Sequence, residues 1–265
     1  MTEKEYRSNP AVSRSELWKI TESPEKFKYY RDNPIAPTPS LIFGQMFHKL
    51  ALEPETFSSE FAVMPNVDRR TREGKEAWNE FKKSADGKTV VSSDDYAKAT
   101  EMCISLQNAP FVRKLLSGER EKEFFWQDDL TGEPCKCRAD CITETRGINI
   151  ITDLKSSSDA TTEHFMKDAV NYGYDFQAGM YRDGIEKCTG KKHIFVFIVV
   201  EKDPPYAVNV LQADEIFIKR GYDIFRELIG IYHDCKVTGN WYGYLGKHTV
   251  INNLSLPAWL AKEIE

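Results

Sequence analysis

Two aspartates and a lysine in the middle of the chain have the residue types and spacing of a hydrolytic metal site. Asp140 lies in one short β-like run, and Asp153 and Lys155 lie in the next. Side chains alternate between the two faces of a strand, so Asp153 and Lys155 share a face. If the two strands are adjacent, we expect both carboxylates and the lysine to converge on one point.

Such a cluster has a specific chemistry. Neighbouring carboxylates repel each other, and a bound cation relieves the repulsion. Oxygen ligands favour a hard ion, Mg²⁺ first and Mn²⁺ close behind. Lys155 could then hold the attacking water or neutralise a phosphate in the transition state, which predicts phosphodiester hydrolysis. The structural alternative is that both aspartates are strand-end or turn residues and that Lys155 is a solvated charge.

The elements that must position these residues fall into two parts. The first, residues 1–118, is predicted to be mainly helical. Ser13 and Glu16 have the spacing of a capping box at a helix start. Apolar residues recur at helical intervals over 40–52 and 94–117.

The second part, residues 119–240, is predicted to be an α/β core. Its expected strands are 122–127, 135–142, 148–155, 193–200 and 206–211, and its expected helices are 162–187, interrupted near Gly173, and 213–236. The run Ile194–Val200 is uniformly apolar, so helices must cover both of its faces. We therefore predict a mixed central sheet flanked by helices within a single domain, 1–265, in which 241–265 form a C-terminal tail.

Composition narrows the class of protein. The chain has 265 residues, of which 41% are hydrophobic, and Lys plus Arg (36) against Asp plus Glu (41) give a net charge of −5. A nucleic-acid surface must therefore be local. The longest apolar run, seven residues, is far short of the roughly 20 of a membrane helix. The first ten residues lack the apolar stretch of a secretory signal, so we expect a cytoplasmic protein without disulfides and without membrane partners.

Four more side chains add to the acidic pattern. Gln177 and Tyr181 lie four residues apart, on one face of the predicted helix that follows the meander. Glu123 lies on the strand before Asp140, and His48 lies on the predicted helix at 40–52. Each has a structural alternative, since helical aromatics usually pack in the core and a histidine among apolar residues is usually a satisfied, partly buried side chain.

The whole pattern resembles the PDDEXK nuclease superfamily. Within it the sequence is most similar to the RecE-type exonuclease (exonuclease VIII) domains of prophage recombination systems. The residues that carry the resemblance are the acid Asp140, the run Asp153-Leu154-Lys155, the pair Gln177 and Tyr181, and the upstream Gly44-to-His48 spacing. The resemblance covers about residues 13–241. It departs at Asp153, where many members have Glu, a ligand longer by one methylene.

The resemblance implies a restriction-endonuclease-like fold and a role for each matching residue. The implied metal ligands are His48, Asp140, Asp153 and the backbone carbonyl of Leu154. The implied catalytic residues are Lys155, Glu123, which would hold a second metal or its water, and Gln177 and Tyr181, which would position the lysine and the scissile phosphate.

The resemblance also implies an activity, the Mg²⁺-dependent degradation of one strand of linear duplex DNA from its 5′ end. The single-stranded products would feed an annealing partner, and the enzyme would act as a ring of identical subunits.

No iron–sulfur cluster is expected, because Cys135, Cys137 and Cys141 lack a closely paired fourth cysteine. Two alternatives stay open: a structure-specific or site-specific endonuclease on the same fold, and a catalytically inactive DNA-binding or assembly module.

Basic residues at two places are candidates for DNA contact. They are Arg69, Arg70 and Arg72 in the segment 66–83, and Arg14 and Ser15 near a predicted helix start. The segment 66–83 has a local charge balance of +2 and could be a DNA-facing arm, although a solvated loop and helix face explains it equally well. The residues at the helix start could meet a 5′-terminal phosphate, although capping alone explains the serine.

Overall fold

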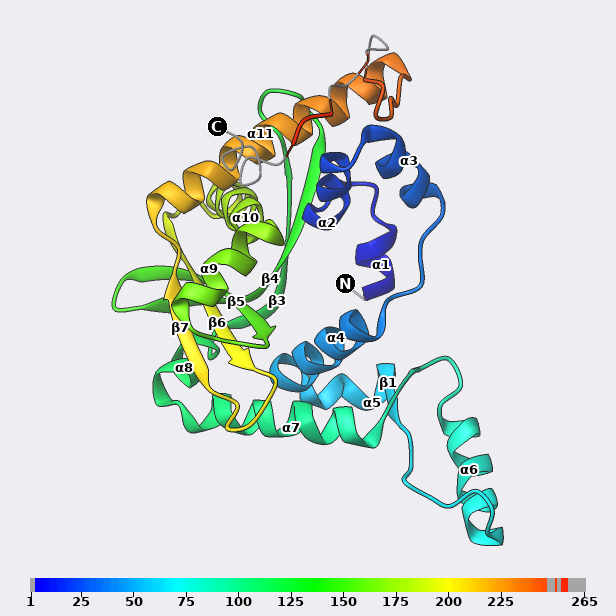
Figure 1. The fold of residues 1–265 in the computed structure, drawn as a ribbon. Helices are drawn as coiled ribbons and strands as arrows, with labels where there is room; N and C mark the ends of the chain where they lie inside the picture. The colour runs from blue at the N-terminus through cyan, green and yellow to red at the C-terminus, as the bar shows by residue number, and fades with distance from the viewer. Residues whose placement is uncertain (1–2, 247–250, 252–253, 257–265) are drawn as a thin grey trace.

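A mixed β-sheet lies at the centre of the computed structural model, which describes residues 3–246, 251 and 254–256. The sheet has five strands in the order β3-β4-β5-β6-β7 (Figure 1). They are β3 (Glu119–Gln127), β4 (Pro134–Thr145), β5 (Ile148–Ser157), β6 (His193–Glu201) and β7 (Val208–Gln212). Only β5 and β6 are parallel neighbours, so the predicted mixed sheet is confirmed. Much of the predicted tail at 241–265 lies outside the described residues.

The hairpin between β4 and β5 sets the two predicted acids side by side. Its loop residues, Arg146 and Gly147, have φ of 53° and 79°. Positive φ at both loop residues is the type I′ geometry, which matches the twist of antiparallel strands. The resulting register pairs Cys141 with Thr152. Asp140, just before Cys141, and Asp153, just after Thr152, therefore lie close together where this ladder ends.

Two long helices cover one face of the sheet. They are α10 (Tyr174–Thr189) and α11 (Glu215–Thr238), and they pack against each other (Figure 1). Gly179 and Gly221 lie where the two helices cross. A Cβ atom at Gly179 would lie 2.3 Å from the backbone of α11, and one at Gly221 would lie 1.7 Å from the carbonyl oxygen of Asp175 on α10. The two backbones therefore touch with no side chain between them.

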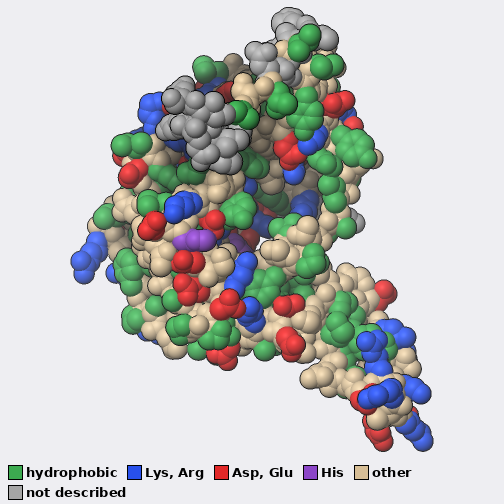
Figure 2. Space-filling view, in the orientation of Figure 1, with side chains coloured by type: hydrophobic (Ala, Val, Ile, Leu, Met, Phe, Trp, Pro, Cys, Tyr) green, Lys and Arg blue, Asp and Glu red, His purple; other side chains and the backbone are tan. Residues whose placement is uncertain are grey.

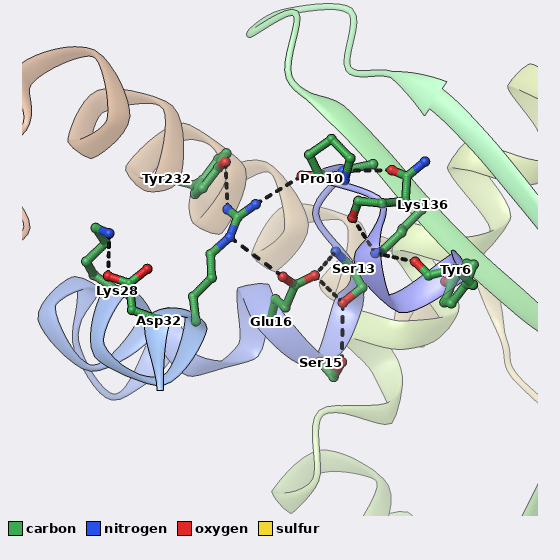
Figure 3. Close-up of polar contacts among 12 residues, drawn as sticks. Tyr6, Pro10, Ser13, Ser15, Glu16, Lys28, Asp32, Lys136 and Tyr232 are labelled. Carbon is green, nitrogen blue, oxygen red and sulfur yellow. Dashed lines mark hydrogen bonds and ion pairs between the residues drawn. The ribbon is translucent and has the colours of Figure 1, made fainter. Parts of the chain in front are cut away.

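Short elements from the N-terminal part complete this side of the molecule. They are α1 (Glu3–Ser8), α2 (Arg14–Leu17), the 3₁₀ helix η1 (Trp18–Thr21) and α3 (Pro24–Asp32), and α9 (Thr162–Asn171) packs beside α10. The predicted capping box forms: Glu16 Oε2 accepts hydrogen bonds from the backbone N–H of Ser13 (2.9 Å) and from its hydroxyl (2.6 Å) (Figure 3). Val12 forms an isolated parallel bridge with Cys135, which ties this segment to β4.

The second face of the sheet is covered by a different set of elements. They are α4 (Pro39–Leu52), the 3₁₀ helix η2 (Pro54–Thr56), α5 (Phe57–Glu60), α7 (Ser93–Asn108), α8 (Pro110–Leu115) and the two-stranded parallel pair β1 (Phe61–Val63) and β2 (Thr89–Val91). The helix predicted at 94–117 is two helices, because Pro110 cannot donate a backbone hydrogen bond and its neighbour Ala109 is extended. Between β1 and β2, α6 (Arg72–Ser84) projects away from the body of the molecule (Figure 1).

The prediction that β6 is covered on both faces is confirmed. Phe195, Phe197 and Val199 belong to the apolar cluster beneath α10 and α11. Val196, Ile198 and Val200 alternate with them and belong to the cluster on the α4 and α7 side. No helix in the described part of the chain has both the length and the apolar character needed to cross a membrane.

The cysteines of β4 divide between these two clusters. Cys135 and Cys137 pack in the cluster beneath α10 and α11, whereas Cys141 packs on the α4 and α7 side. Strand alternation alone would place all three on one face, because they lie at odd-numbered positions of the same strand. β4 pairs with β3 over Pro134–Ile142 and with β5 over Cys141–Thr145, and its two ends pack against different helices.

Candidate active site

A cavity of about 1190 Å³ opens between the N-terminal helices and the sheet. Figure 2 shows the surface hollowed at this place, with acidic and basic side chains inside the hollow. The predicted site residues that line it are Arg14, Ser15, His48, Asp140, Lys155, Gln177 and Tyr181. Asp153 and Leu154 are buried beneath its surface. Glu123, Arg69, Arg70 and Arg72 are not among its lining residues.

Asp153, Lys155 and Gln177 form one tight polar cluster at the base of the cavity. Asp153 Oδ2 lies 2.5 Å from Lys155 Nζ. The Gln177 amide joins the pair, because its Nε2 donates to Asp153 Oδ1 and its Oε1 accepts from Lys155 Nζ at 3.2 Å. The ammonium also lies 4.6 Å from the ring centroid of Tyr174. The lysine is thus held from three directions. We call Asp153, Lys155 and Gln177 the lysine cluster.

The charges of this cluster are set by burial and by each other. Burial raises the pKa of Asp153 above its usual range, and the ion pair with Lys155 offsets only part of that shift. Burial also disfavours the ammonium of Lys155, but the neighbouring groups, Asp153 first, outweigh it and raise the pKa of Lys155. The lysine therefore stays protonated at neutral pH.

A second cluster lies beside the first and is more open. His48, Glu121 and Asp140 each present a ligand atom, and these atoms all lie within 4.8 Å of one another. His48 Nδ1 is 3.5 Å from Asp140 Oδ2. The same carboxylate oxygen accepts a hydrogen bond from the backbone N–H of Leu154 at 2.6 Å, which fixes Asp140 against β5. We call this group the acid–histidine cluster.

Helix α4 brings His48 into this cluster. Thr38 caps the helix by accepting a hydrogen bond from the backbone N–H of Leu41, and Pro39 occupies its first turn. Phe43 and Phe47 pack into the core, and His48 lies on the side that faces the cavity. The predicted helix at 40–52 is confirmed with almost the same bounds.

Glu121 is the functional candidate that sequence reasoning missed. It lies opposite Asp140, between the ladder pairs Arg120–Cys141 and Lys122–Ala139, whereas Glu123 pairs with Arg138. The predicted strand began at residue 122, but β3 begins at Glu119, so Glu121 fell outside it. The available signal was the alternation of acids at 119, 121 and 123. The role assigned to Glu123 stays a prediction.

The backbone of Glu121 is strained, and its carboxyl lies where a negative charge is unfavourable. Its φ of 47° is a left-handed conformation that non-glycine residues rarely adopt. Burial, and then the negative charge of Asp140, raise the pKa of Glu121 to about 8. Arg138 is its counterion, with Nε 2.8 Å from Glu121 Oε2. Burial and Asp140 thus outweigh Arg138, so the shift favours the protonated form of this carboxyl.

The two clusters together fit a divalent cation. Paired carboxylates are oxygen donors of the kind that hold Mg²⁺ or Mn²⁺, and His48 adds one nitrogen donor. The raised pKa of Glu121 has the same origin, because burial and the charge of Asp140 outweigh its ion pair with Arg138. His48, Glu121 and Asp140 would therefore hold the ion, next to Asp153.

The remaining predicted residues of the cavity lie on its walls. Tyr181 is half-buried, and burial raises the pKa of its hydroxyl well above the usual range, so it stays protonated. Arg14 donates to the backbone carbonyls of Tyr172 and Gly173, the latter at 2.9 Å. The Ser15 hydroxyl lies 3.3 Å from that of Ser13 (Figure 3). The structure thus brings Arg14 and Ser15 to the cavity, and their contact with DNA stays a prediction.

The arginines of the projecting segment lie apart from the cavity. Arg70 is paired with Asp68 at 3.0 Å and Arg72 with Glu76 at 2.9 Å. Arg69 stacks over the Trp78 ring, 4.0 Å from its centroid. All three are exposed on the arm that α6 forms (Figure 1). A contact with DNA there would be remote from the chemistry.

Comparisons with known proteins agree with the fold. The family described as "PDDEXK-like domain of unknown function (DUF3799)" matches residues 13–253. A crystal structure from Eubacterium rectale, described as a "Putative exonuclease", has a similar fold, with a TM-score of 0.62 at 13% identity over 98% of this chain and 97% of that one. The crystal structure of SSO0001 is more distant, with a TM-score of 0.33 at 15% identity over 71% and 85% of the two chains. Among curated proteins, none matches the chain.

Proposed function

Because the chain belongs to the DUF3799 family of PDDEXK-like domains, we propose that it is a Mg²⁺-dependent exodeoxyribonuclease that degrades linear double-stranded DNA from its 5′ ends. The observation that carries the proposal is the placement of the acid–histidine cluster beside the lysine cluster in one cavity. A cation site next to a fixed ammonium suits hydrolysis of a phosphodiester.

The residues of the chain divide the work. His48, Glu121 and Asp140 would hold the cation, which supplies Lewis-acid stabilisation of the phosphate when bound. Lys155, protonated and held by Asp153 and Gln177, would neutralise the negative charge that develops on the phosphate or orient the water that attacks it. Because the lysine is fixed before substrate arrives, no reorganisation is needed at the moment of reaction.

A single digestion experiment tests the proposal. Linear duplex labelled at either end, with and without a 5′ phosphate, is compared with covalently closed plasmid, in Mg²⁺ and in EDTA. We expect loss of label from the 5′ end of linear DNA, intact plasmid and no reaction in EDTA. The variant Asp140→Ala is the control for contaminating nuclease. Plasmid cut as readily as linear DNA would instead assign an endonuclease, and no cleavage of any substrate would leave a binding or assembly module.

The assembly and the partner are further parts of the proposal. We infer a ring of identical subunits around DNA and single-stranded products passed to an annealing protein, on the strength of the resemblance to RecE-type exonucleases. Light scattering of the purified chain measures the number of subunits. A monomer at all concentrations, with or without DNA, would contradict the ring.

A further inference from the structure

Most cations of the cavity already have partners. The Lys and Arg side chains that line it are Arg7, Arg14, Arg31, Lys49, Lys136, Arg138, Lys155 and Lys202. Carbonyl oxygens hold Arg14 and Lys136, carboxylates hold Arg31, Lys49, Arg138 and Lys155, and Arg7 also has a partner. Within the described residues, Lys202 is the exception. Its ammonium is therefore available to an incoming anion.

Lys202 lies where the parallel strands β5 and β6 end. Its backbone N–H donates to the carbonyl of Ser157 at 2.9 Å, one residue beyond β6. Ser156 and Ser158 line the cavity at the same place, and in the described part of the chain neither hydroxyl has a hydrogen-bond partner. Lys155 lies just before these serines on β5. The carboxyl ends of parallel strands are the usual ligand-binding edge of an α/β sheet.

The acidic side chains near this edge have partners other than Lys202. Asp168, which also lines the cavity, has Oδ2 3.5 Å from His164 Nε2. Glu201 accepts a hydrogen bond from a backbone N–H at 3.0 Å, and Asp203 pairs with Lys98 at 3.0 Å. None of these carboxylates is the ion-pair partner of the lysine that lies between Glu201 and Asp203 in the sequence.

We propose that Lys202, with the hydroxyls of Ser156 and Ser158, binds a phosphodiester of the cleaved strand next to the scissile one. The proposal rests on the proposed nuclease function. A strand rises about 3.3 Å per residue, so β5, which ends at Ser157, carries the chain roughly 7 Å beyond Lys155 before Ser158. The two lysines therefore engage different phosphates. An ammonium and two hydroxyls contact the backbone without reading bases, so Lys202 is a positioning residue that aligns the strand.

The test compares Lys202→Ala with a control at the opposite end of the same strand. Lys192 directly precedes β6, is exposed, and pairs with Glu186 at 2.7 Å, so Lys192→Ala removes the same charge away from the cavity. Binding of a duplex with a recessed end is measured in Ca²⁺, which replaces Mg²⁺ to prevent cleavage, over a series of KCl concentrations. We expect Lys202→Ala to reduce the slope of log affinity against log salt by about 1. Lys192→Ala should leave it unchanged.

Steady-state cleavage in Mg²⁺ provides the second readout. Lys202→Ala should raise KM several-fold and leave kcat within about twofold, because the contact aligns the strand without touching the reacting atoms. Lys202→Arg should restore both the KM and the salt slope, which a merely structural loss would not do. A variant with the wild-type salt slope and KM would overturn the proposal.

Substrates with a 5′ phosphate or a 5′ hydroxyl separate the two sources of the anion. An internal phosphodiester is present in both substrates, so the deficit of Lys202→Ala should be equal on the two. A deficit confined to the 5′-phosphorylated substrate would assign Lys202 to the terminal phosphate and would overturn the internal assignment. If the wild-type protein neither binds nor cleaves DNA, the proposed function fails, whereas a wild type that cleaves beside an unaffected variant defeats this inference alone.

Discussion

The lysine cluster and the acid–histidine cluster are neighbours with opposite electrostatic designs. In the lysine cluster an ammonium, a carboxylate and an amide satisfy one another in a buried place. In the acid–histidine cluster two carboxyls crowd together, and one of them has a pKa of about 8. The first cluster is internally balanced, whereas in the second the guanidinium of Arg138 does not offset burial and the charge of Asp140. The contrast favours the acid–histidine cluster as the cation site and the lysine cluster as a fixed positive charge.

Replacing Lys155 is expected to have the largest effect, and it tests whether the two clusters have separate roles. Lys155→Ala should reduce kcat by about 10²–10³-fold, the cost of losing one preorganised charge at the transition state. Binding of Mn²⁺ and of DNA should persist, because the acid–histidine cluster is untouched. Single-turnover cleavage and calorimetric Mn²⁺ titration measure the two properties. Unchanged turnover would remove the catalytic role of Lys155, and lost Mn²⁺ binding would show that the two clusters are not separable.

Glutamates two residues apart on β3 provide a matched pair for the other cluster. Glu121→Gln removes a carboxylate beside Asp140. Glu123→Gln removes a carboxylate from the residue whose backbone lies opposite Arg138 in the ladder. Mn²⁺ affinity should fall by about 10–100-fold in Glu121→Gln and change little in Glu123→Gln. Titration calorimetry compares them directly. The reverse order would return the metal role to Glu123.

The pH dependence of cation binding also tests whether Glu121 is a ligand of the cation. Glu121, with its pKa raised to about 8 in the metal-free protein, must lose a proton to become a ligand. Apparent Mn²⁺ affinity should therefore rise about tenfold per pH unit up to about pH 8 and then level off. Glu121→Gln should flatten this rise. Calorimetry in buffers of different ionisation enthalpy counts the released protons, and binding without proton release near pH 7 would contradict the raised pKa.

The smallest effect is expected at the amide that completes the lysine cluster. Gln177→Met keeps the side-chain length but loses both polar contacts, so Lys155 should be less well aligned and kcat should fall about tenfold, the cost of one hydrogen bond to a charged group. Mn²⁺ affinity should stay at the wild-type value. Gln45→Met, on the α4 wall of the same cavity, is the control. A loss of the same size in both variants would point to general disturbance of the cavity.

The parts of the site that could be predicted from sequence are those that depend on local rules. Strand alternation places Asp153 and Lys155 on one face, and the two-residue turn at Arg146-Gly147 sets the register that brings Asp140 to them. The uniformly apolar run Ile194–Val200 required helices on both faces of the sheet, which the structure has. In each case neighbours in sequence decide the outcome.

The parts that sequence reasoning missed depend on packing between distant segments. Glu121 could be chosen over Glu123 only once the start of β3 and its register with β4 were known. Lys202 lies in a connection after β6, where no periodicity applies, and it stands out only because the other described lysines and arginines that line the cavity have partners. The single expected helix at 94–117 overlooked that Pro110 ends one helix and begins another.

The crossing of α10 and α11 has a consequence for how the catalytic groups tolerate change. Gln177 reaches the cavity from α10, and two residues further along that helix Gly179 lies against the backbone of α11. Any bulk inserted at this junction would lift α10 and carry the amide away from Lys155. The position of Gln177 in the cavity therefore depends on Gly179 and Gly221, two residues without a functional group. A search for reactive side chains alone would miss them.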